Sequence, residues 1–477
     1  MTGRSILLLA KTGFIIRDLL LGKFSDELIK SCRLYAAVPN PNDSGLLSFC
    51  QQKSITLLPF LTREETNTNK KYLEPQHIMY RFKQVERGNS SFAINTRLLK
   101  AKYTPKQKFL VDTLLLTGKM INGLGLMGIS EEIFLQVISK WTVTEQWINL
   151  LAEIKPDMVV STMLTLPGGL FSPSVDLPVL LAAKRLGIPC GTLIQSWDNL
   201  CSKAYVLPRW LDHYWTWSQA MSTDLMRFNP RIDTKRIKVV GSPHYDYHLD
   251  ETLREPREIF LRKLGLDPNR KYVVIGTGTK TMLPNEPLMV IGLSKKIHAC
   301  IPDLQILLRI HPKDDKSRWI NIANELSDSG VIIQNPIPWK PMDLGGFTPP
   351  QEYFHELINT IVHASVVINT TSSLTVDSSI IDRPIVSICY DVIPDDKFPK
   401  GRAYEYNFSE HFKPLVDTGG IWLALSEEDC ITAIKTYIEK PDLHQQQRKK
   451  ITEIIGGDNY GVAGMNLARA VVNAVNG

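Results

Sequence analysis

The sequence predicts an α/β protein with two domains, each built around a mostly parallel sheet. At 477 residues the chain is too long for one ordinary core. Short apolar runs such as residues 5–10 and 272–276 alternate with helix-length segments, as in parallel sheets that are buried on both faces. The same alternation of apolar strands and helix-length segments starts again in the second half of the chain. This predicts a first domain at 1–245 and a second domain with terminal helices at 246–477.

The first domain is expected to open with a strand followed by a helix over residues 14–31. Further helices are expected over 133–153 and 179–186, while the polar stretch 62–91 allows no assignment. The expected strands are 5–10, 35–38, 55–59, 158–163 and 191–195.

The second domain is expected after a linker near residues 242–256 and a strand at 237–241. Helices are expected at 254–264, 427–437 and 443–475, and the last two either cap the second domain or cross back to the first. Its expected strands are 272–276, 304–310, 331–334, 366–369 and 385–390.

Composition excludes several classes of protein. The 43% hydrophobic and 22% charged residues are typical of a folded globular chain. The net charge of +6 comes without dense Lys/Arg tracts, so a nucleic-acid partner is not expected. Seven scattered cysteines, with no C-x-x-C pair, indicate reduced thiols, a cytoplasmic location and no metal site.

Residues 98–125 mix lysines with apolar residues at helical spacing. Such a stripe packs inside a domain or lies on a membrane surface, and packing is the commoner outcome. The basic stretch 97–108 leaves a peripheral contact with the inner face of a membrane open.

Ligands of open parallel sheets bind at the carboxyl ends of the strands. A glycine-rich turn follows the expected strand 272–276, where backbone N–H groups, hydroxyls and an ammonium group could hold phosphate. A plain tight loop explains the same turn equally well. His311 and Lys313 follow the next strand and are expected to contact a phosphate, although a lone histidine is more often structural. The turn comprises Gly276, Thr277, Gly278, Thr279 and Lys280.

A second candidate segment follows the expected strand 366–369. Hydroxyl residues, among them Thr371, Ser372 and Ser373, open a helix whose N-terminus would accept an anion. Ordinary N-capping is the alternative, although a cap needs only one such residue. Asp377, one turn further along, is expected to accept hydrogen bonds from a ribose diol.

The first domain offers a counterpart after residues 191–195. Trp197 and Asn199 are expected to contact an acceptor, and Asp198 could take a proton from an acceptor hydroxyl if burial raises its pKa. A turn shaped by Asp198 and Asn199 is an equally good interpretation.

At these segments the chain resembles the GT-B glycosyltransferases, and among them the CDP-glycerol glycerophosphotransferases and the capsule and surface-polysaccharide transferases. The matching blocks are His311-Pro312, Ser372-Ser373 with Asp377, and Arg383-Pro384. The stretch 241–246 is similar to the one that closes the linker strand in such enzymes. The resemblance implies two Rossmann-like domains facing a cleft, with the acceptor bound by the first domain and the nucleotide donor by the second.

The resemblance further implies a glycosyltransferase that needs no cofactor or metal. It would move a sugar from a CMP-, CDP- or UDP-linked donor, with a cytidine nucleotide preferred over UDP, to a surface-glycan or lipid-linked acceptor. Inversion with Asp198 as base is the preferred mechanism, and retention stays open. The glycerophosphotransferases carry Trp-His-Gly-Thr-Pro-Leu-Lys where this chain has residues 197–200 as Trp-Asp-Asn-Leu. This departure favours sugar transfer over glycerol phosphate transfer.

Two other functions stay open. A nucleotide-sugar 2-epimerase of the non-hydrolysing type shares the fold, but it would need further carboxylates and a histidine in the first domain, and the sequence does not reveal that constellation. A catalytically silent GT-B scaffold that binds a nucleotide or a glycan is the third possibility.

Overall fold

The computed structural model describes most of the chain, and it divides into two compact units. Unit 1 comprises Met1–His244, Pro341–Thr348 and Gly457–Gly477, and unit 2 comprises Tyr245–Lys340 and Pro349–Gly456. The described residues are 3–61, 75–101, 103–142, 145–162, 164–166, 176–202, 204–205, 207–335, 337, 340–341, 347–348 and 351–477.

Unit 1 is built on a parallel sheet that the structure describes as seven strands in the order β3-β2-β1-β4-β6-β8-β9. The order reverses beside β1, which gives a doubly wound sheet with its switch point between β1 and β4. These strands are β1 (Ser5–Leu9), β2 (Arg33–Val38), β3 (Thr56–Pro59), β4 (Met158–Ser161), β6 (Cys190–Leu193), β8 (His213–Thr216) and β9 (Ile237–Val239).

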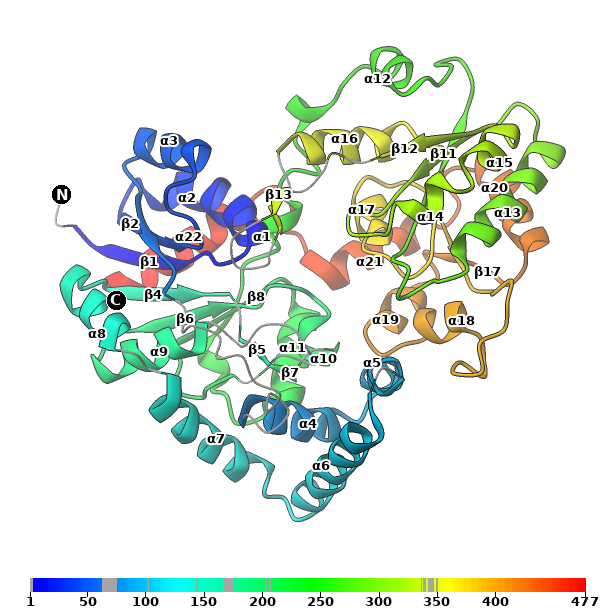
Figure 1. Ribbon diagram of the computed structural model, residues 1–477. Coiled ribbons are helices and arrows are strands. Elements are labelled where there is room, and N and C mark those ends of the chain that lie inside the picture. Colours follow the sequence, from blue (N-terminus) through cyan, green and yellow to red (C-terminus); the bar gives the residue numbers. More distant parts are fainter. Residues whose placement is uncertain are drawn as a thin grey trace. The chain divides into compact units, whose positions relative to one another are not determined.

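The helices of unit 1 lie partly on the two faces of this sheet and partly at the periphery of the unit (Figure 1). They are α1 (Gly13–Ile15), α2 (Lys23–Leu28), α3 (Ser44–Gln52), α4 (Pro75–Arg87), α5 (Ser90–Lys100), α6 (Pro105–Gly123), α7 (Met127–Thr142), α8 (Glu145–Ile154), α9 (Asp176–Arg185), α10 (Asn199–Ser202), α11 (Gln219–Phe228) and α22 (Ala463–Asn476). A short antiparallel pair, β5 (Thr165–Leu166) and β7 (Ala204–Tyr205), lies apart from the main sheet.

Two features of unit 1 differ from the sequence-based prediction. The helix expected over 14–31 is interrupted, because a π-helical stretch at Ile16–Leu20 ends before Gly22, whose extended backbone starts α2. Strand β8 was not predicted, since four residues with one histidine carry little periodic signal. The structure has two helices, α7 and α8, where one was expected over 133–153, and the helical spacing at 98–125 falls on the end of α5 and on α6. Helix α4 lies in the stretch left unassigned, of which residues 62–74 fall outside the described part.

The close contact between β6 and β8 depends on Gly191. A Cβ atom there would come within 2.2 Å of the buried Trp215 ring, which occupies the space beside this glycine. The indole therefore packs directly against the β6 backbone.

Unit 2 repeats the plan with a parallel sheet whose described strands run in the order β12-β11-β10-β15-β16-β17. Its switch point lies between β10 and β15. These strands are β10 (Tyr272–Gly276), β11 (Gln305–Arg309), β12 (Val331–Gln334), β15 (Val366–Asn369), β16 (Ile385–Ile388) and β17 (Trp422–Ala424). The three-residue β17 was not predicted.

The helices of unit 2 cover both faces of its sheet. They are α12 (Arg257–Leu264), α13 (Glu286–Cys300), α14 (Ser317–Ile320), α15 (Ala323–Asp328), α16 (Gln351–Val362), α17 (Leu374–Ile380), α18 (Arg402–Asn407), α19 (Lys413–Val416), α20 (Glu427–Glu439) and α21 (Gln445–Gly456). Two short strands, β13 (Lys340–Pro341) and β14 (Phe347–Thr348), form a separate pair, of which β14 belongs to unit 1.

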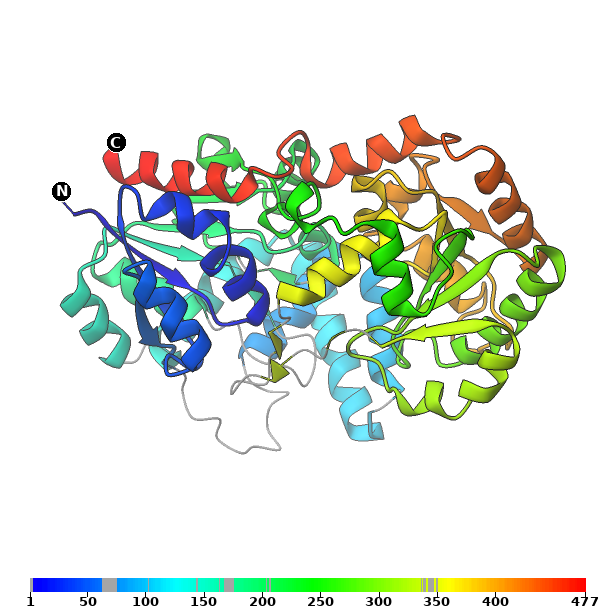
Figure 2. The ribbon, with the colours of Figure 1, turned by 90° about the horizontal axis from the view of Figure 1, so that it is seen from above.

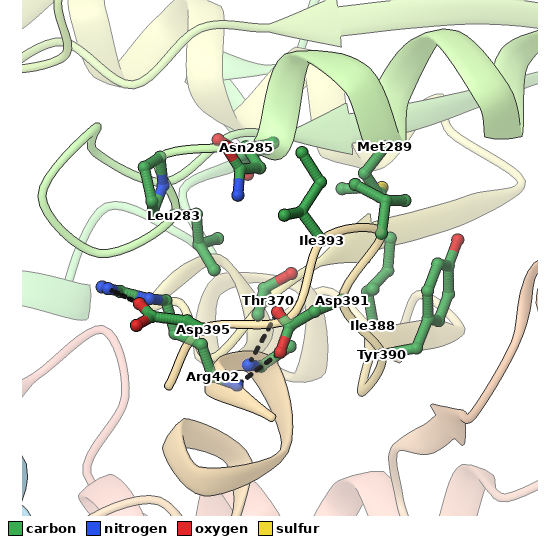
Figure 3. Close-up of a pocket in the computed structure, with 14 residues that line it drawn as sticks. Leu283, Asn285, Met289, Thr370, Ile388, Tyr390, Asp391, Ile393, Asp395 and Arg402 are labelled. Atoms are coloured by element: carbon green, nitrogen blue, oxygen red, sulfur yellow. Dashed lines mark hydrogen bonds and ion pairs between the residues drawn. The ribbon is translucent and has the colours of Figure 1, made fainter. Parts of the chain in front are cut away.

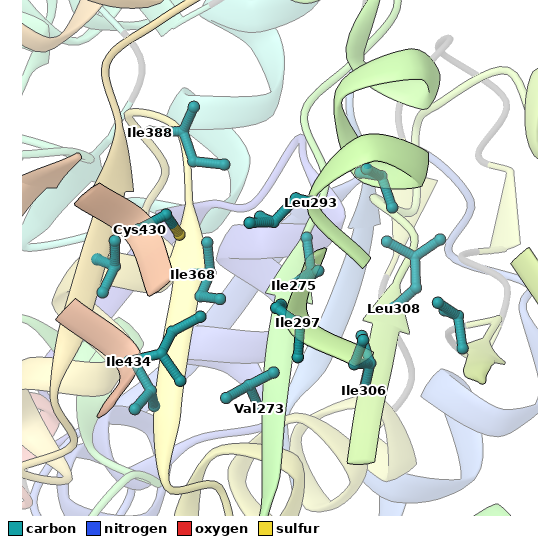
Figure 4. Close-up of a cluster of buried hydrophobic side chains, with 14 of the residues drawn as sticks. Val273, Ile275, Leu293, Ile297, Ile306, Leu308, Ile368, Ile388, Cys430 and Ile434 are labelled. Atoms are coloured by element: carbon teal, nitrogen blue, oxygen red, sulfur yellow. The ribbon is translucent and has the colours of Figure 1, made fainter. Parts of the chain in front are cut away.

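The core of unit 2 shows why successive residues of β10 are apolar. Along β10, Val273 and Ile275 pack into one core layer with α13 and α20, shown in Figure 4. Tyr272 and Val274 pack into the layer on the other face, with α12 and α16. Because neighbouring side chains point to opposite faces, a strand covered on both faces must be apolar at each position.

The C-terminal helix α22 belongs to unit 1, which corrects the predicted range 246–477. Figure 2 shows α22 beside α2, and the two helices are in contact. Lys23 Nζ donates to the Gly461 carbonyl at 2.8 Å, and Arg469 pairs with Glu27 at 2.9 Å. The predicted fold class, α/β with two Rossmann-like domains, is confirmed.

The described helices were also compared with the requirements for crossing a bilayer. None of them combines the length and the apolar content that a membrane span needs.

Candidate functional site

The switch point of unit 2 gathers most of the residues that the sequence singled out. The carboxyl ends of β11, β10 and β15 are neighbours, since β10 pairs with both other strands. The loop after β10, His311 after β11 and the hydroxyl run after β15 therefore meet at one edge of the sheet.

The glycine-rich turn after β10 is held by hydrogen bonds within unit 2. Gly276 is needed for packing, because a Cβ there would lie 2.3 Å from Leu374 Cδ2. The Thr277 hydroxyl is buried and accepts the backbone N–H of His311 at 2.8 Å. Thr279, half-buried, accepts the backbone N–H groups of Met282 and Leu283 at 2.9 Å through its carbonyl.

A buried carboxylate organises the same turn. The Gly278 N–H donates to Glu286 Oε1 at 2.8 Å, and Arg318 donates to Glu286 Oε2 at 2.7 Å. Burial raises the pKa of Glu286 to about 7, against the opposing effects of the Gly278 N–H and of Arg318. Arg318 also pairs with Asp314 at 2.8 Å, so the network joins the loop after β10 to the one after β11.

The two lysines of this edge point to solvent. Lys280 Nζ pairs with Asp315 at 3.0 Å, and its backbone N–H donates to Asp314 at 2.7 Å. Lys280 thus has a carboxylate partner already, and its predicted contact with phosphate would have to replace that partner. Lys313 is exposed at the end of the His-Pro-Lys block.

His311 is a neutral hydrogen-bonding group. Burial and the neighbouring Lys313 lower the pKa of His311 to about 4, so the ring is uncharged at neutral pH. Its Nδ1 accepts the Lys313 N–H at 3.1 Å, which leaves the proton on Nε2. The imidazole can therefore donate a hydrogen bond to a phosphate oxygen, but it brings no positive charge.

The hydroxyl run after β15 adopts a strained turn. Thr371 has a left-handed backbone with φ of 46°, which is uncommon for a residue other than glycine and marks sites that the surrounding structure holds in place. Ser372 Oγ accepts the Leu374 N–H at 3.2 Å, and Ser373, at the exposed start of α17, makes no side-chain cap. Only one of the hydroxyls therefore acts as an ordinary cap.

Buried polar atoms at this strand end lack protein partners. Among the described residues, Asn369 Nδ2 and Thr371 Oγ1 are buried without a hydrogen bond. An unpaired buried polar group costs about 1–3 kcal/mol, so such atoms mark places where a water or a ligand is bound. They follow β15 directly, where the sequence predicted an anion.

Asp377 has a protein partner. Its carboxylate oxygen Oδ1 lies 2.7 Å from His248 Nε2, within hydrogen-bond distance, and both side chains are buried. The predicted contact between Asp377 and a ribose stays a prediction, and it competes with this pair.

A small cavity lies beside the switch point (Figure 3). Its volume is about 40 Å³, and it is lined by Thr370 after β15 and by Tyr390, Asp391 and Arg402 from the segment after β16. Arg402 donates to the carbonyls of Thr281 and Met282 at 3.0 Å and pairs with Asp395. Ligand pockets usually exceed about 300 Å³, so this cavity can hold only part of a nucleotide.

In unit 1, Asp198 follows β6 as predicted, and its carboxylate is held by hydroxyls. Ser196 Oγ donates to Oδ1 at 2.5 Å and Ser202 Oγ donates to Oδ2 at 2.7 Å. The Asp198 carbonyl also accepts the backbone N–H of Ser202 at 2.8 Å. These contacts start α10, which supports the turn interpretation. The carboxylate is half-buried, so a catalytic role stays a prediction.

The two predicted acceptor residues differ in exposure. Asn199 is buried at the start of α10, whereas Trp197 is half-buried. Of the two, only Trp197 keeps an exposed part of its side chain for a ligand.

A charged cluster that the sequence did not reveal lies elsewhere in unit 1. His244 Nδ1 is 3.2 Å from Asp18 Oδ2, and Arg17 contacts both side chains. Arg17 is buried, while the exposed fractions of Asp18 and His244 are 11% and 25%. Asp18 lies in the helical segment after β1, and His244 lies in a 3₁₀ turn (Pro243–Tyr245) after β9.

The electrostatics of this cluster keep Asp18 ionised. Burial opposes ionisation, but the charges and hydrogen bonds of Arg17 and His244 outweigh it, so the pKa of Asp18 is lowered. A fixed carboxylate beside a partly exposed imidazole is an arrangement that can exchange a proton with a bound substrate.

A larger cavity, of about 320 Å³, lies in unit 1 between α4, α6, α7 and residues 228–232. Its buried Lys83 pairs with Glu86 and Glu131, both at 2.8 Å, and Arg209 pairs with Glu132 at 2.7 Å. These charged side chains therefore already form ion pairs with one another.

Comparison with known proteins identifies the fold. No protein-family model and no curated protein sequence matches the chain. The UDP-GlcNAc 2-epimerase from Methanocaldococcus jannaschii matches with a TM-score of 0.53 at 14% identity, over 99% of this chain and all of that one. A putative UDP-N-acetylglucosamine 2-epimerase from Listeria monocytogenes matches with a TM-score of 0.54 at 10% identity, over 100% of this chain and 97% of that one.

A glycosyltransferase from Rickettsia africae matches with a TM-score of 0.52 at 10% identity, over 100% of this chain and 99% of that one. At these identities the likeness shows the fold and nothing finer. The chain thus has a GT-B fold of two Rossmann-like domains, while the narrower resemblance to CDP-glycerol glycerophosphotransferases is not confirmed.

Proposed function

We propose that the protein is an enzyme that binds a nucleoside diphosphate sugar through unit 2 and breaks the bond between the anomeric carbon and the diphosphate. The observation that carries this proposal is the edge after β10, β11 and β15. It combines the neutral donor His311, the strained turn at Thr371 and the unpartnered buried atoms of Asn369 and Thr371. Such groups suit the oxygens of a diphosphate and a ribose.

Uridine is the base we favour. Both epimerases named above are named for UDP-linked N-acetylglucosamine, and the Staphylococcus aureus MnaA–UDP complex also matches, with a TM-score of 0.52 at 11% identity. This replaces the sequence-based choice among CMP, CDP and UDP with UDP as the first ligand to test.

Within this class, the first candidate activity is epimerisation at C2 of the sugar. Inverting a carbon centre requires removal of its proton and return of a proton to the opposite face. Loss of the C2 proton together with departure of the nucleoside diphosphate from C1 leaves a C1–C2 double bond, and re-addition restores the nucleotide sugar. Asp18 and His244 supply the carboxylate and the histidine that this chemistry needs.

Glycosyl transfer is the second candidate. Asp198 lies at the carboxyl end of β6, half-buried and next to Trp197, where it could take the proton of an acceptor hydroxyl. The acceptor would be a surface glycan or a lipid-linked sugar, and no metal would be needed. Two hydroxyls already donate to the Asp198 carboxylate oxygens, so an acceptor hydroxyl would have to compete with them, and we place this activity second.

One experiment separates these activities. The protein is incubated with UDP-GlcNAc in D₂O and followed by ¹H NMR. Epimerisation gives the manno epimer with deuterium at C2 and requires no acceptor. Transfer gives free UDP only when an acceptor is added. If UDP raises the melting temperature but neither product forms, the protein is a nucleotide-binding scaffold; if UDP has no effect, the proposal fails.

A further inference from the structure

Exposed apolar side chains are concentrated on α6, on α7 and on the turn between them in unit 1. Phe109 is 76% exposed, Leu116 60% and Met120 62%. In Figure 1 the two helices lie at the periphery of unit 1, away from its sheet. We define the apolar face by its seven exposed large side chains: Phe109, Leu116, Met120, Leu124, Leu126, Ile129 and Ile133.

The three residues of α6 form a single stripe. At 100° per residue, Phe109, Leu116 and Met120 fall within about 40° of one another around the helix axis. The buried residues Val111 and Gly118 lie on the opposite side. The helix is therefore apolar on two sides, although only one of them packs against the protein.

The packing of α6 fixes which side is exposed. The buried side lies against α4, where a Cβ on Gly118 would come within 3.2 Å of Phe82 and 3.3 Å of Val85. Glycine lets the two helices approach closely at this point. The stripe of Phe109, Leu116 and Met120 consequently cannot turn toward the core without breaking that contact.

Lysines flank the stripe on both sides. By helical position, Lys108 and Lys119 lie on one flank and Lys106 on the other. All three are exposed, and among the described residues none of them forms an ion pair. The acidic residue of the helix, Asp112, is paired with Lys100. The surface therefore combines apolar side chains with a rim of positive charge.

We propose that the apolar face of α6 and α7 docks on the surface of an anionic lipid bilayer. Apolar side chains inserted at the headgroup boundary and lysines contacting anionic headgroups are the two interactions that hold an amphipathic helix in this position. The proposal does not depend on the activity proposed above, since it concerns binding to lipid only.

A second copy of the chain is the competing occupant. A two-fold contact through α6 would bring the lysine flanks of the two copies together, and like charges would oppose it. An anionic surface meets the same lysines with the opposite charge. Charge complementarity therefore favours the bilayer.

The test is co-sedimentation with lipid vesicles. We expect the full chain to bind vesicles of phosphatidylcholine and phosphatidylglycerol, to bind pure phosphatidylcholine more weakly, and to be released as salt is raised. Leu116→Asp with Met120→Asp should lower the vesicle partition coefficient at least about tenfold, because charges then enter the apolar face. Both positions are exposed, so the fold should tolerate the change.

Matched controls keep the result interpretable. Ile320→Asp alters a side chain of unit 2 that is 71% exposed, and it should leave binding unchanged. Neutralising Lys106, Lys108 and Lys119 to Gln should weaken binding to anionic vesicles. The same change at three exposed lysines of unit 2, Lys435, Lys449 and Lys450, should have little effect.

Three outcomes would overturn the proposal. The first is that the unmodified chain does not bind anionic vesicles. The second is that Leu116→Asp with Met120→Asp binds as well as the unmodified chain. The third is a dimer in analytical ultracentrifugation that the same double variant converts to a monomer, which would assign the face to a second copy.

Discussion

Asp18 and His244 lie 3.2 Å apart, although 226 positions separate them in the chain. Asp18 follows the first strand of unit 1, and His244 is the residue at which the chain leaves that unit for the first time. Arg17 fixes the geometry, because it contacts both side chains and is itself buried. The cluster is thus assembled by the fold of unit 1 rather than by any local segment.

If this pair transfers the proton at C2, His244→Gln should lower the rate of epimerisation and of deuterium incorporation at least about 100-fold. The glutamine keeps a hydrogen-bonding group, and the position is partly exposed, so the melting temperature should change little. ¹H NMR in D₂O with UDP-GlcNAc measures both rates. Normal rates in this variant would remove His244 from the mechanism.

Asp18→Asn should have a second effect, on stability. The change leaves the buried guanidinium of Arg17 without its carboxylate, and breaking a buried pair in this way costs about 3–5 kcal/mol. Urea unfolding would show the loss, and activity should be compared only where the variant is folded. An unchanged unfolding free energy would mean that the pair contributes little.

Glu286 should make stability depend on pH. Its pKa is about 7 in the folded protein, against an ordinary glutamate value of 4.5, so the folded state holds the proton more tightly. The resulting stabilisation is fully present below about pH 4.5 and is lost as the pH rises through about 7. The stability of the Glu286→Gln variant should depend less on pH. The difference in unfolding free energy between the two proteins, measured with urea, should change by about 1–3 kcal/mol between pH 5 and 8. A constant difference would show that Glu286 titrates normally.

His311 should contribute to nucleotide affinity without a charge. His311→Ala should weaken UDP binding about five- to tenfold, the usual effect of one hydrogen bond. Because the pKa of His311 is about 4, this loss should be the same at pH 6 and at pH 8 when measured by calorimetry. A loss that grows as the pH falls would indicate a charged imidazole instead.

Asp198 can be tested against its two supporting hydroxyls. If the residue only shapes the turn, Asp198→Asn and Ser202→Ala should both lower stability by about 1–2 kcal/mol and leave turnover unchanged. If it is the base of a transferase, Asp198→Asn alone should lower turnover at least about 100-fold. Parallel unfolding and product assays decide between the two roles.

The packing of Gly191 against Trp215 gives a test of the fold itself. Gly191→Ala should destabilise unit 1 by about 1–3 kcal/mol, because the methyl group would overlap the indole ring. Gly123→Ala, at a position where a Cβ meets no atom within 4 Å, is the matched control and should not be destabilising. Equal stability of the two variants would show that the β6–β8 contact can relax.

The strands could be predicted where both of their faces are buried, because successive residues must then be apolar. The runs at Ser5–Leu9 and Tyr272–Gly276 are apolar because each side chain faces one layer or the other. Strands β8 and β17 were missed, since three or four residues that include a polar or aromatic side chain carry no period. The predicted helix over 14–31 is interrupted at Gly22, whose extended backbone separates the stretch Ile16–Leu20 from α2, and the apolar spacing of the sequence does not mark this break.

The candidate site was predictable only where it follows strand ends in the sequence. His311 and the turn at Thr371 were found in this way, because a strand and the loop after it are adjacent in the chain. Glu286 was missed, since its role comes from the Gly278 N–H and from burial. Asp18 and His244 were missed because their contact spans 226 positions and leaves no local pattern.

Because α22 packs against α2, unit 1 is completed only when residues 457–477 have been synthesised. A ribosome synthesises α2 near the start of the chain, but the helix that covers it arrives only with residues 457–477, after the whole of unit 2. Unit 2 ends at residue 456, so it can fold before the last helix of unit 1 has been synthesised. The nascent chain thus carries an uncovered apolar surface on α2 throughout most of translation, and this is the surface that a chaperone would have to protect.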